Sequence, residues 1–500
     1  MRLRQLTGAA LLGLRRADLA LEKGELANAV LKGDGTEKDF LRLAGSLGLY
    51  EKMGALPAKL NGSEHEVAEE QPLKKRPIKK AVRAFATMLE GRHGDLLREY
   101  LLILKETGQS VPAEYLPMLL ERAAKVIALR PYVLDVLTRA DRELAEQNPH
   151  WMFASSRAYD WDMLLKQWRS KVMTSRQGIL LQARLHDPDL GRELLASSWK
   201  AETSTGAIWM LRSLQTGLSM NDEPFLEMAL DSRNVAVRRR AAELLSMLPA
   251  SRLSERMTRA TETLLSIENK TIKVNFPEVF SADMLRDGVA VRNWKDPVKV
   301  QAAQLSDLLA SVPLEVWTAR LNASPSDIVA LAAASQQRQA LLSGFASAAE
   351  RQRAEDWAQE ILAEDKLGLA SIKLVSLLST KNAYSLIKSL DEGIWTKSHP
   401  VLKLFGRYPH AWDEPLLDTF LNGLERYLAS NPDASEKNVL MKTCLRNAAK
   451  LSPRESCSRY LKSIGQLLYR YPAWRSSFQD ALMTSEFRST MLAALYQPRH

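Results

Sequence analysis

The sequence predicts an all-α fold in which antiparallel helix pairs stack side by side as an α-solenoid, and three observations support this prediction. Long segments are rich in Leu, Ala, Arg and Glu, which favour helix, whereas β-branched runs are few. Only 23 glycines and 21 prolines interrupt the 500 residues. Finally, Asn221–Met257 has the pattern of one helical repeat: a helix, a tight polar turn and a second helix. Neither helix can bury its apolar stripe alone, so such units must stack on neighbours.

The repeat-like unit can be followed residue by residue. Its first helix is expected to begin at Asn221 or Asp222, because both residue types cap free N–H groups, and a turn is expected at 231–234. The second helix places its apolar residues on one stripe: Val237, Ala241, Leu244, Leu245 and Leu248. Arg239 and Glu243 are expected to lie four residues apart on the solvent face.

Shifts in composition divide the chain into five predicted segments. Residues 1–53 are predicted to form N-terminal helices, and 54–80 a linker or loop that combines Pro57, Gly62 and blocks of charge. Residues 81–265 are predicted to form the helical repeat domain, 266–296 an insert, and 297–500 a C-terminal helical domain.

The insert is predicted to contain the only strands of the chain. Thr271–Pro277 is the one convincing strand-like run, and Arg286–Val289 has the composition of a turn. A β-hairpin, or another ordered insert near 268–296, is therefore expected between two helical halves.

Clusters of basic residues provide the candidate binding surface. Lys and Arg exceed Asp and Glu by 69 to 59, which gives a net charge of +10. This mild excess is compatible with an acidic protein, nucleic acid or an anionic surface as partner. The candidate residues are Arg233, Arg238, Arg239, Arg240, Lys74, Lys75 and Arg76. The structural alternative is that the first four form a solvated or ladder-forming helix face, and that the last three belong to a solvated linker.

The sequence contains no motif for phosphate-loop, dinucleotide, nucleophile-elbow or zinc-protease chemistry. Its seven histidines are dispersed, so we expect neither a metal nor a cofactor and assign no catalytic residue. The acidic–aromatic cluster at 159–162 suits either a helix N-terminus or acid–base chemistry. Cys444 and Cys457 are interpreted as free thiols in a reducing compartment. No stretch reaches the ~20 apolar residues of a membrane span, and a cytoplasmic location is expected.

The repeat unit resembles HEAT repeats. In those repeats an arginine that follows a valine commonly pairs with an aspartate of the preceding turn. Arg238 matches that arginine, but Ser232 occupies the aspartate position and Asp231 lies one residue away. The resemblance therefore implies the fold without a regular Asp–Arg ladder.

Several segments together resemble the bacterial domain-of-unknown-function family numbered 5691. They are 143–151, 185–199, the repeat unit 221–257, and 286–317, which begins with Arg-Asp-Gly. The resemblance departs at 141–142, where Asp-Arg replaces an expected Arg-Gly, and at Ser232. It implies a HEAT-like helical protein without an assigned activity, encoded near a MoxR-type AAA+ ATPase and a von Willebrand factor A-type protein.

Three functional hypotheses follow. The first is a non-catalytic scaffold or adaptor that binds a protein partner, such as that AAA+ ATPase or von Willebrand factor A-type protein, through the surface of its stacked helices. The alternative is a basic nucleic-acid-binding protein similar to the HEAT-like DNA glycosylases, whose binding would depend steeply on salt. The third is an enzyme whose site is assembled from residues far apart in the sequence.

Overall fold

The structure is a computed structural model in which the chain forms two compact units, Met1–Leu73 and Lys74–His500. It describes residues 75–496 apart from 159, 170–172, 263, 277–280, 290–294, 369–370, 392, 394, 398 and 432–437, and of residues 1–74 it describes Ser46. The predicted N-terminal helices, 1–53, therefore lie outside the described residues except at that position. All further statements concern the second unit.

The second unit is mostly helical, as predicted. Its first α-helices are α4 (Lys79–Leu89), α5 (Leu97–Glu106), α6 (Leu116–Lys125), α7 (Arg130–Val136), α8 (Arg139–Glu146), α9 (Trp161–Trp168), α10 (Met173–His186), α11 (Pro188–Ser198), α12 (Ser204–Ser213), α13 (Glu223–Ala229), α14 (Val235–Leu245) and α15 (Arg252–Ala260). The α-helices that follow are α16 (Ala282–Arg286), α17 (Pro297–Leu309), α18 (Leu314–Leu321), α19 (Pro325–Ala333), α20 (Arg338–Gln352), α21 (Glu355–Glu364), α22 (Thr380–Leu390), α23 (Pro400–Arg407), α24 (Glu414–Ser430), α25 (Val439–Leu451), α26 (Cys457–Arg470) and α27 (Arg475–Leu495).

Short 3₁₀-helices join several of these helices. They are η1 (Gly94–Leu96), η2 (Ala113–Tyr115), η3 (Ile127–Leu129), η4 (Pro149–Ala154), η5 (Trp199–Ala201), η6 (Met220–Asp222), η7 (Ile372–Leu377), η8 (Arg454–Ser456) and η9 (Pro472–Trp474). Prolines such as Pro188, Pro325 and Pro400 stand in the first turn of an α-helix, where their missing N–H costs no hydrogen bond.

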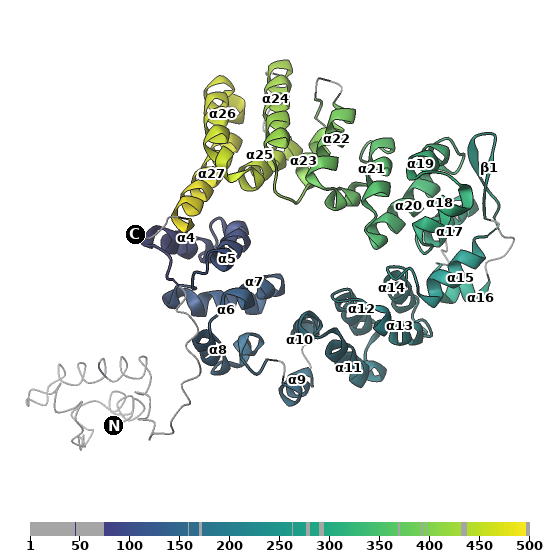
Figure 1. The fold of residues 1–500 in the computed structure, drawn as a ribbon, viewed down its shortest axis with the longest axis horizontal. Coiled ribbons are helices and arrows are strands. Elements are labelled where there is room, and N and C mark those ends of the chain that lie inside the picture. The colour runs from purple at the N-terminus through teal and green to yellow at the C-terminus, as the bar shows by residue number, and fades with distance from the viewer. Residues whose placement is uncertain are drawn as a thin grey trace, which may run out of the picture. The chain divides into compact units, whose positions relative to one another are not determined.

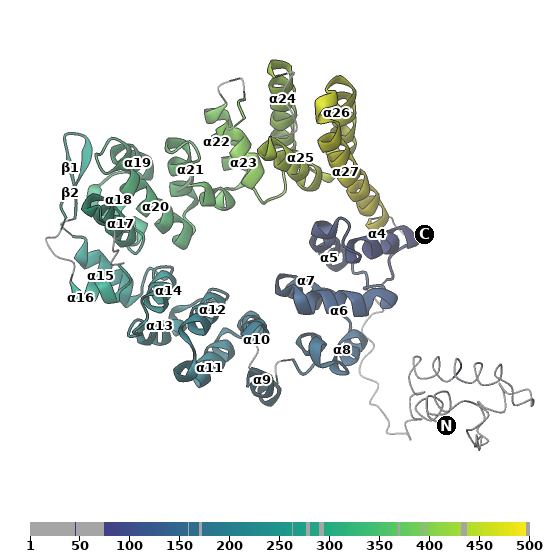
Figure 2. The same cartoon turned by 180° about the vertical axis from the view of Figure 1, so that it is seen from behind.

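The helices pack in two rows through contacts between neighbours. One row runs through α10, α12 and α14, while α11 and α13 lie beside it (Figure 1; Figure 2). Further along the chain, direct contacts join α17 to α20, α20 to η7, η7 to α23, α23 to α25 and α25 to α27. Most of these helices therefore bury apolar residues against neighbouring helices.

The predicted β-hairpin is present, but it begins slightly earlier than expected. Strands β1 (Leu265–Glu268) and β2 (Thr271–Val274) pair antiparallel, with Leu265 opposite Val274. Asn269 and Lys270 form the turn with φ of 48° and 58°, which matches the right-handed twist of a hairpin. The hairpin packs against α19, and just after that helix the Ser335 hydroxyl donates to the Ile272 carbonyl at 2.6 Å.

Two apolar cores stabilise the second unit. The first core contains buried residues between Ala81 and Ala154, together with Cys457 and the end of α27 from Met491 to Leu495. The second core contains buried residues from Leu164 to Ala481. Because α27 contributes Phe478 and Ala481 to the second core, this one helix belongs to both.

Helix α27 also connects the end of the second unit to its beginning, so that the helix–helix contacts form a closed series. It packs against α4 and α5, which begin the second unit, and both views show its end beside α4 (Figure 1; Figure 2). The Arg488 guanidinium donates to the Glu99 carboxylate at 2.8 Å and to the Ser452 carbonyl at 2.8 Å. The first and last helices of the unit are therefore bound to each other directly.

Candidate protein-binding surface

Arginine side chains cap the C-terminal ends of many helices in this fold. The last carbonyls of an α-helix have no partner inside the helix and carry partial negative charge, which a guanidinium satisfies. Helix ends are capped by Arg122 at α4, Arg130 at α6, Arg142 at α7, Arg184 after α12, Arg238 after α13, Arg320 at α15, Arg351 at α17, Arg338 at α19 and α21, and Arg488 at α25. Much of the basic excess therefore has a structural role.

The most deeply buried of these caps is Arg184. Its side chain and that of Asp222 are both 0% exposed, and they form a bidentate ion pair with two distances of 2.8 Å. Arg184 also donates to the carbonyls of Leu214, Thr216 and Gly217. Asp222 is the N-cap of α13, which begins at Glu223, so one of the two expected cap positions is confirmed. Its side chain makes no cap hydrogen bond to α13, however, and accepts instead from Arg184 and from the Ser219 N–H in the capping box of η6.

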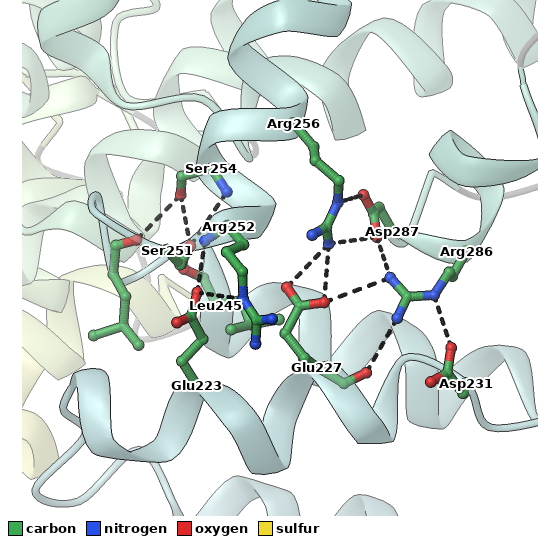
Figure 3. A network of polar contacts seen from close by, with 11 residues as sticks. Glu223, Glu227, Asp231, Leu245, Ser251, Arg252, Ser254, Arg256, Arg286 and Asp287 are labelled. Carbon is green, nitrogen blue, oxygen red and sulfur yellow. Dashed lines mark hydrogen bonds and ion pairs between the residues drawn. The ribbon is translucent and has the colours of Figure 1, made fainter.

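A second charged network joins α13, α15 and α16 (Figure 3). Arg256 donates to both oxygens of Asp287, at 2.7 and 2.9 Å, and to Glu227 at 3.0 Å. Arg286 donates to Asp231 at 2.8 Å and lies 3.5 Å from Glu227. The pKa of Arg256 is raised, above all by its hydrogen bonds to Asp287. Both arginines hold these carboxylates as salt-bridge partners, and the network attaches α16 to the repeat unit.

The Arg-Asp-Gly sequence of the predicted turn explains how α16 docks. Arg286 and Asp287 enter the charged network, and Asp287 is only 2% exposed. Gly288 has a φ of +100°, and a Cβ at this position would lie 2.6 Å from the Ala242 Cβ of α14. A glycine is therefore required both by the backbone conformation and by the close approach to α14.

The predicted arginines of the repeat unit divide into two groups. Arg238 donates to the carbonyls of Ser232 and Arg233, at 2.8 and 3.2 Å, so it caps the turn. Asp231, the neighbouring carboxylate, pairs with Arg286 instead. Arg233 and Arg239 are exposed, and neither side chain has a hydrogen-bond partner among the described residues.

Arg240 is engaged by Glu243 on the same helix. The two side chains form an ion pair at 2.9 Å, in which the side chain of Arg240 is only 16% exposed, whereas Arg239 is exposed as the sequence predicted. The second Nη of Arg240 donates to the Gln215 Oε1 atom at 3.2 Å.

The basic cluster at 74–76 is separate from the repeat-unit arginines. Lys74 lies outside the described residues. Lys75 is exposed, and its carbonyl accepts from the Ser110 N–H at 2.9 Å. Arg76 forms an exposed ion pair with Glu114, which follows α5. Among the described residues, no hydrogen bond or ion pair joins Lys75 or Arg76 to Arg233, Arg238, Arg239 or Arg240.

An exposed aromatic residue on α12 was missed by sequence reasoning. Trp209 is 41% exposed, and the Arg212 guanidinium lies 4.7 Å from its ring centroid. Gln215, just after the end of α12, is also exposed and accepts from Arg240 on α14, a helix that packs directly on α12. We call this surface the Trp209 strip, defined by Trp209, Arg212, Gln215, Arg239 and Arg240. Trp and Arg are the residue types that dominate the energetics of protein interfaces.

The spacing of apolar residues along α12 would have identified Trp209 as an exposed residue. Thr205, Trp209 and Arg212 alternate with the buried residues Gly206, Ala207, Met210 and Leu211. A tryptophan outside the apolar stripe of its own helix is a candidate for binding and not for packing.

Neither a metal-ligand cluster nor a membrane-spanning helix is present among the described residues. They contain no group of three or more His, Cys, Asp or Glu residues arranged to hold a metal ion. None of their helices is both long and apolar enough to span a membrane.

Fold and surface together define an all-helical protein with a two-stranded hairpin, charged networks between its helices, and one exposed Trp–Arg strip. The chain belongs to the Family of unknown function (DUF5691), whose model matches residues 5–495. This match confirms the resemblance to the family numbered 5691. Comparison with curated proteins and with solved structures gives no significant match.

Proposed function

We propose that this protein is a non-catalytic, HEAT-like helical scaffold that binds a protein partner through the Trp209 strip. The observation that carries the proposal is the exposed Trp209 ring with the Arg212 guanidinium over it, on a helix that packs directly against α14, which bears Arg239 and Arg240. An aromatic ring held by a neighbouring cation is already ordered before binding, so less conformational entropy is lost on association.

The charges of the strip indicate the chemistry of its partner. Arg212 and Arg239 are exposed cations, whereas the only carboxylate bonded to the strip, Glu243, is already paired with Arg240. A partner that presents carboxylates around an apolar pocket would complement this surface. Family resemblance suggests a MoxR-type AAA+ ATPase or a von Willebrand factor A-type protein in that role. The two buried free thiols, Cys444 and Cys457, support a cytoplasmic location for such a complex.

Affinity purification of the tagged full chain from its native cells tests the proposal. The purification is carried out at moderate salt with and without nuclease, and retained proteins are identified by mass spectrometry. We expect a defined partner of the AAA+ or von Willebrand factor A class to remain after nuclease treatment. The double variant Trp209→Ala, Arg212→Ala should lose that partner, because truncating hot-spot residues costs about 2 kcal/mol or more each.

Tyr469→Ala is the matched control, because Tyr469 is an aromatic residue on α26 that is 85% exposed. This variant should retain the partner, and circular dichroism should show that both variants are folded. Equal recovery of the partner by the Trp209 variant and the wild-type protein would refute the role of the strip. Recovery of nucleic acid alone, lost at high salt, would favour the nucleic-acid alternative instead.

A further inference from the structure

A cavity of about 460 Å³ lies between the two apolar cores, bounded by the end of α6, η4, α9 and α10. Phe153 lines it from the first core and Ile179 from the second. Its volume lies within the range of small-molecule sites in proteins.

Arg130 supplies an uncompensated positive charge at this cavity. Its Nε and one Nη donate to the carbonyls of Ala123 and Ala124, both at 3.2 Å, and its guanidinium lies 4.5 Å from the centroid of Phe153. No carboxylate pairs with Arg130 among the described residues, and its Nη1 has no hydrogen-bond partner there. Burial lowers the pKa of Arg130 to about 10. Arg130 is half-buried. A half-buried cation that has only carbonyl dipoles as partners gains from an anion.

Gly178 of α10 provides the space in which Arg130 lies. A Cβ at position 178 would come within 2.9 Å of the Arg130 Nη1 atom. Gly178 is buried, so no other side chain fills this position. The missing side chain therefore leaves room for Nη1 against the backbone of α10.

The other charges of the cavity have the same sign. Lys125 and His150 are the other charged or titratable residues of the lining, and the described lining contains no Asp or Glu. The neighbouring carboxylate, Glu121, does not line the cavity and is bound by Lys125 at 3.1 Å and by the Trp151 Nε1 atom at 3.4 Å. The electrostatic field in the cavity therefore favours an anion.

The rest of the lining is apolar with two amides. Ile127, Met152, Phe153 and Ile179 provide the apolar surface, while Gln167 and Gln182 provide hydrogen-bonding groups. From this combination we propose that the cavity is a binding site for a small organic anion, with its phosphate or carboxylate at Arg130 and its apolar body between the two cores. Such a ligand would bridge Phe153 and Ile179 and so strengthen the contact between the cores.

Isothermal titration calorimetry with the full chain tests this site, and the probes are phenyl phosphate, inorganic phosphate and benzyl alcohol. We expect phenyl phosphate to bind once per chain and at least about tenfold more tightly than either of the others, because only it has both an anion and an apolar body. Equal affinities for phenyl phosphate and inorganic phosphate would overturn the proposal, since the apolar walls would then contribute nothing.

Two variants separate binding from folding. The variant Arg130→Met should lose phenyl phosphate but keep its weak affinity for benzyl alcohol. Arg130 also caps α6, so its replacement could disturb the fold as well as the site. A second, double variant, Lys125→Gln with His150→Gln, therefore alters two exposed side chains of the cavity lining instead. The double variant should weaken phenyl phosphate binding by about tenfold. Arg233→Gln, an exposed charge on the α13–α14 turn, is the control and should leave binding unchanged. An unchanged affinity in the double variant would refute the site.

Discussion

The two apolar cores meet at two joints that differ in chemistry. At the continuous joint the chain runs directly from Ala154 of the first core to Leu164 of the second, yet the side chains there enclose the cavity at Arg130. At the closing joint, α27, the last helix of the second unit, packs against α4 and α5, the first two α-helices of that unit. Helix α27 contributes buried residues to both cores. The comparison predicts that the closing joint, although its elements lie far apart in the sequence, is the more firmly attached of the two because its side chains are more complementary.

The polar contacts reinforce this contrast. At the closing joint, Arg488 is 6% exposed and pairs with Glu99, while the Gln109 Nε2 atom donates to the Leu495 carbonyl at 2.7 Å. Tyr496 adds a hydrogen bond to Glu106 at 2.9 Å. At the continuous joint, the Gln182 side chain donates to the Phe153 carbonyl, and the described residues show no ion pair between the two cores there. The closing joint should therefore be the more sensitive to mutation.

Arg488→Ala should have the largest effect on stability. It leaves the Glu99 carboxylate and the Ser452 carbonyl without their partner, and breaking a buried ion pair costs about 3–5 kcal/mol. Urea unfolding monitored by circular dichroism measures this loss, and hydrogen exchange should show opening of α27 and α4 first. A loss below about 1 kcal/mol would mean that the ion pair does not hold the joint.

Leu492→Ala should have the next largest effect. Leu492 is 4% exposed in the first core, and truncating such a residue removes apolar contacts and leaves a cavity, at a cost of about 2–4 kcal/mol. Met483→Ala is the matched control on the same helix, because Met483 is 60% exposed. If both variants lose equal stability in urea, the apolar contact of α27 with the first core is not what stabilises the joint.

Gln182→Ala tests the continuous joint and should cost less. It removes the hydrogen bond to Phe153 and leaves a buried carbonyl unpaired, for a loss of about 1–2 kcal/mol. Thermal unfolding provides the measurement. A loss larger than that of Arg488→Ala would reverse the comparison between the two joints.

The smallest expected effect is the pH dependence of stability that arises at the closing joint. His93 stacks on Phe487 of α27 with ring centroids 4.4 Å apart, and its pKa is lowered by burial, with Arg92 and Lys450 adding to the effect. In the pH range from the ordinary value of 6.5 down to the lowered pKa, the unfolded chain binds more protons than the folded protein. Stability should therefore be complete above pH 6.5 and decline as the pH falls through that range.

The variant His93→Asn removes this titration while suiting the left-handed backbone at position 93, where φ is 52°. Unfolding free energies at several pH values should then decline less on acidification than in the wild-type protein. Parallel pH profiles of variant and wild type would show that His93 does not contribute.

The sequence predicted features that depend on neighbouring residues in the same helix. The stripe of α14 is one example, since Val237, Ala241, Leu244 and Leu245 are all buried. The all-helical class and the hairpin follow from the same local preferences. The roles of Asp222 and Glu99 were not predictable, because their arginine partners lie 38 and 389 residues away. Periodicity identifies the buried face of a helix but not the element that covers it.

The candidate surface shows the same limit. An arginine count predicts a basic patch, but Arg238 and Arg240 are largely engaged by a turn and by Glu243. Whether a guanidinium is free depends on which helix end or carboxylate lies within reach. The pattern on α12 could have predicted an exposed binding residue from the sequence, because Trp209 falls outside the buried stripe of that helix.

The closed sequence of helix contacts has a consequence for proteolysis. In an open array of helices, one cleavage between two elements leaves fragments that are held together at a single boundary. In this unit, a fragment that ends at α27 also keeps its contacts with α4 and α5. A protein nicked once in a connecting segment should therefore migrate as one species on a native gel, although a denaturing gel shows two fragments.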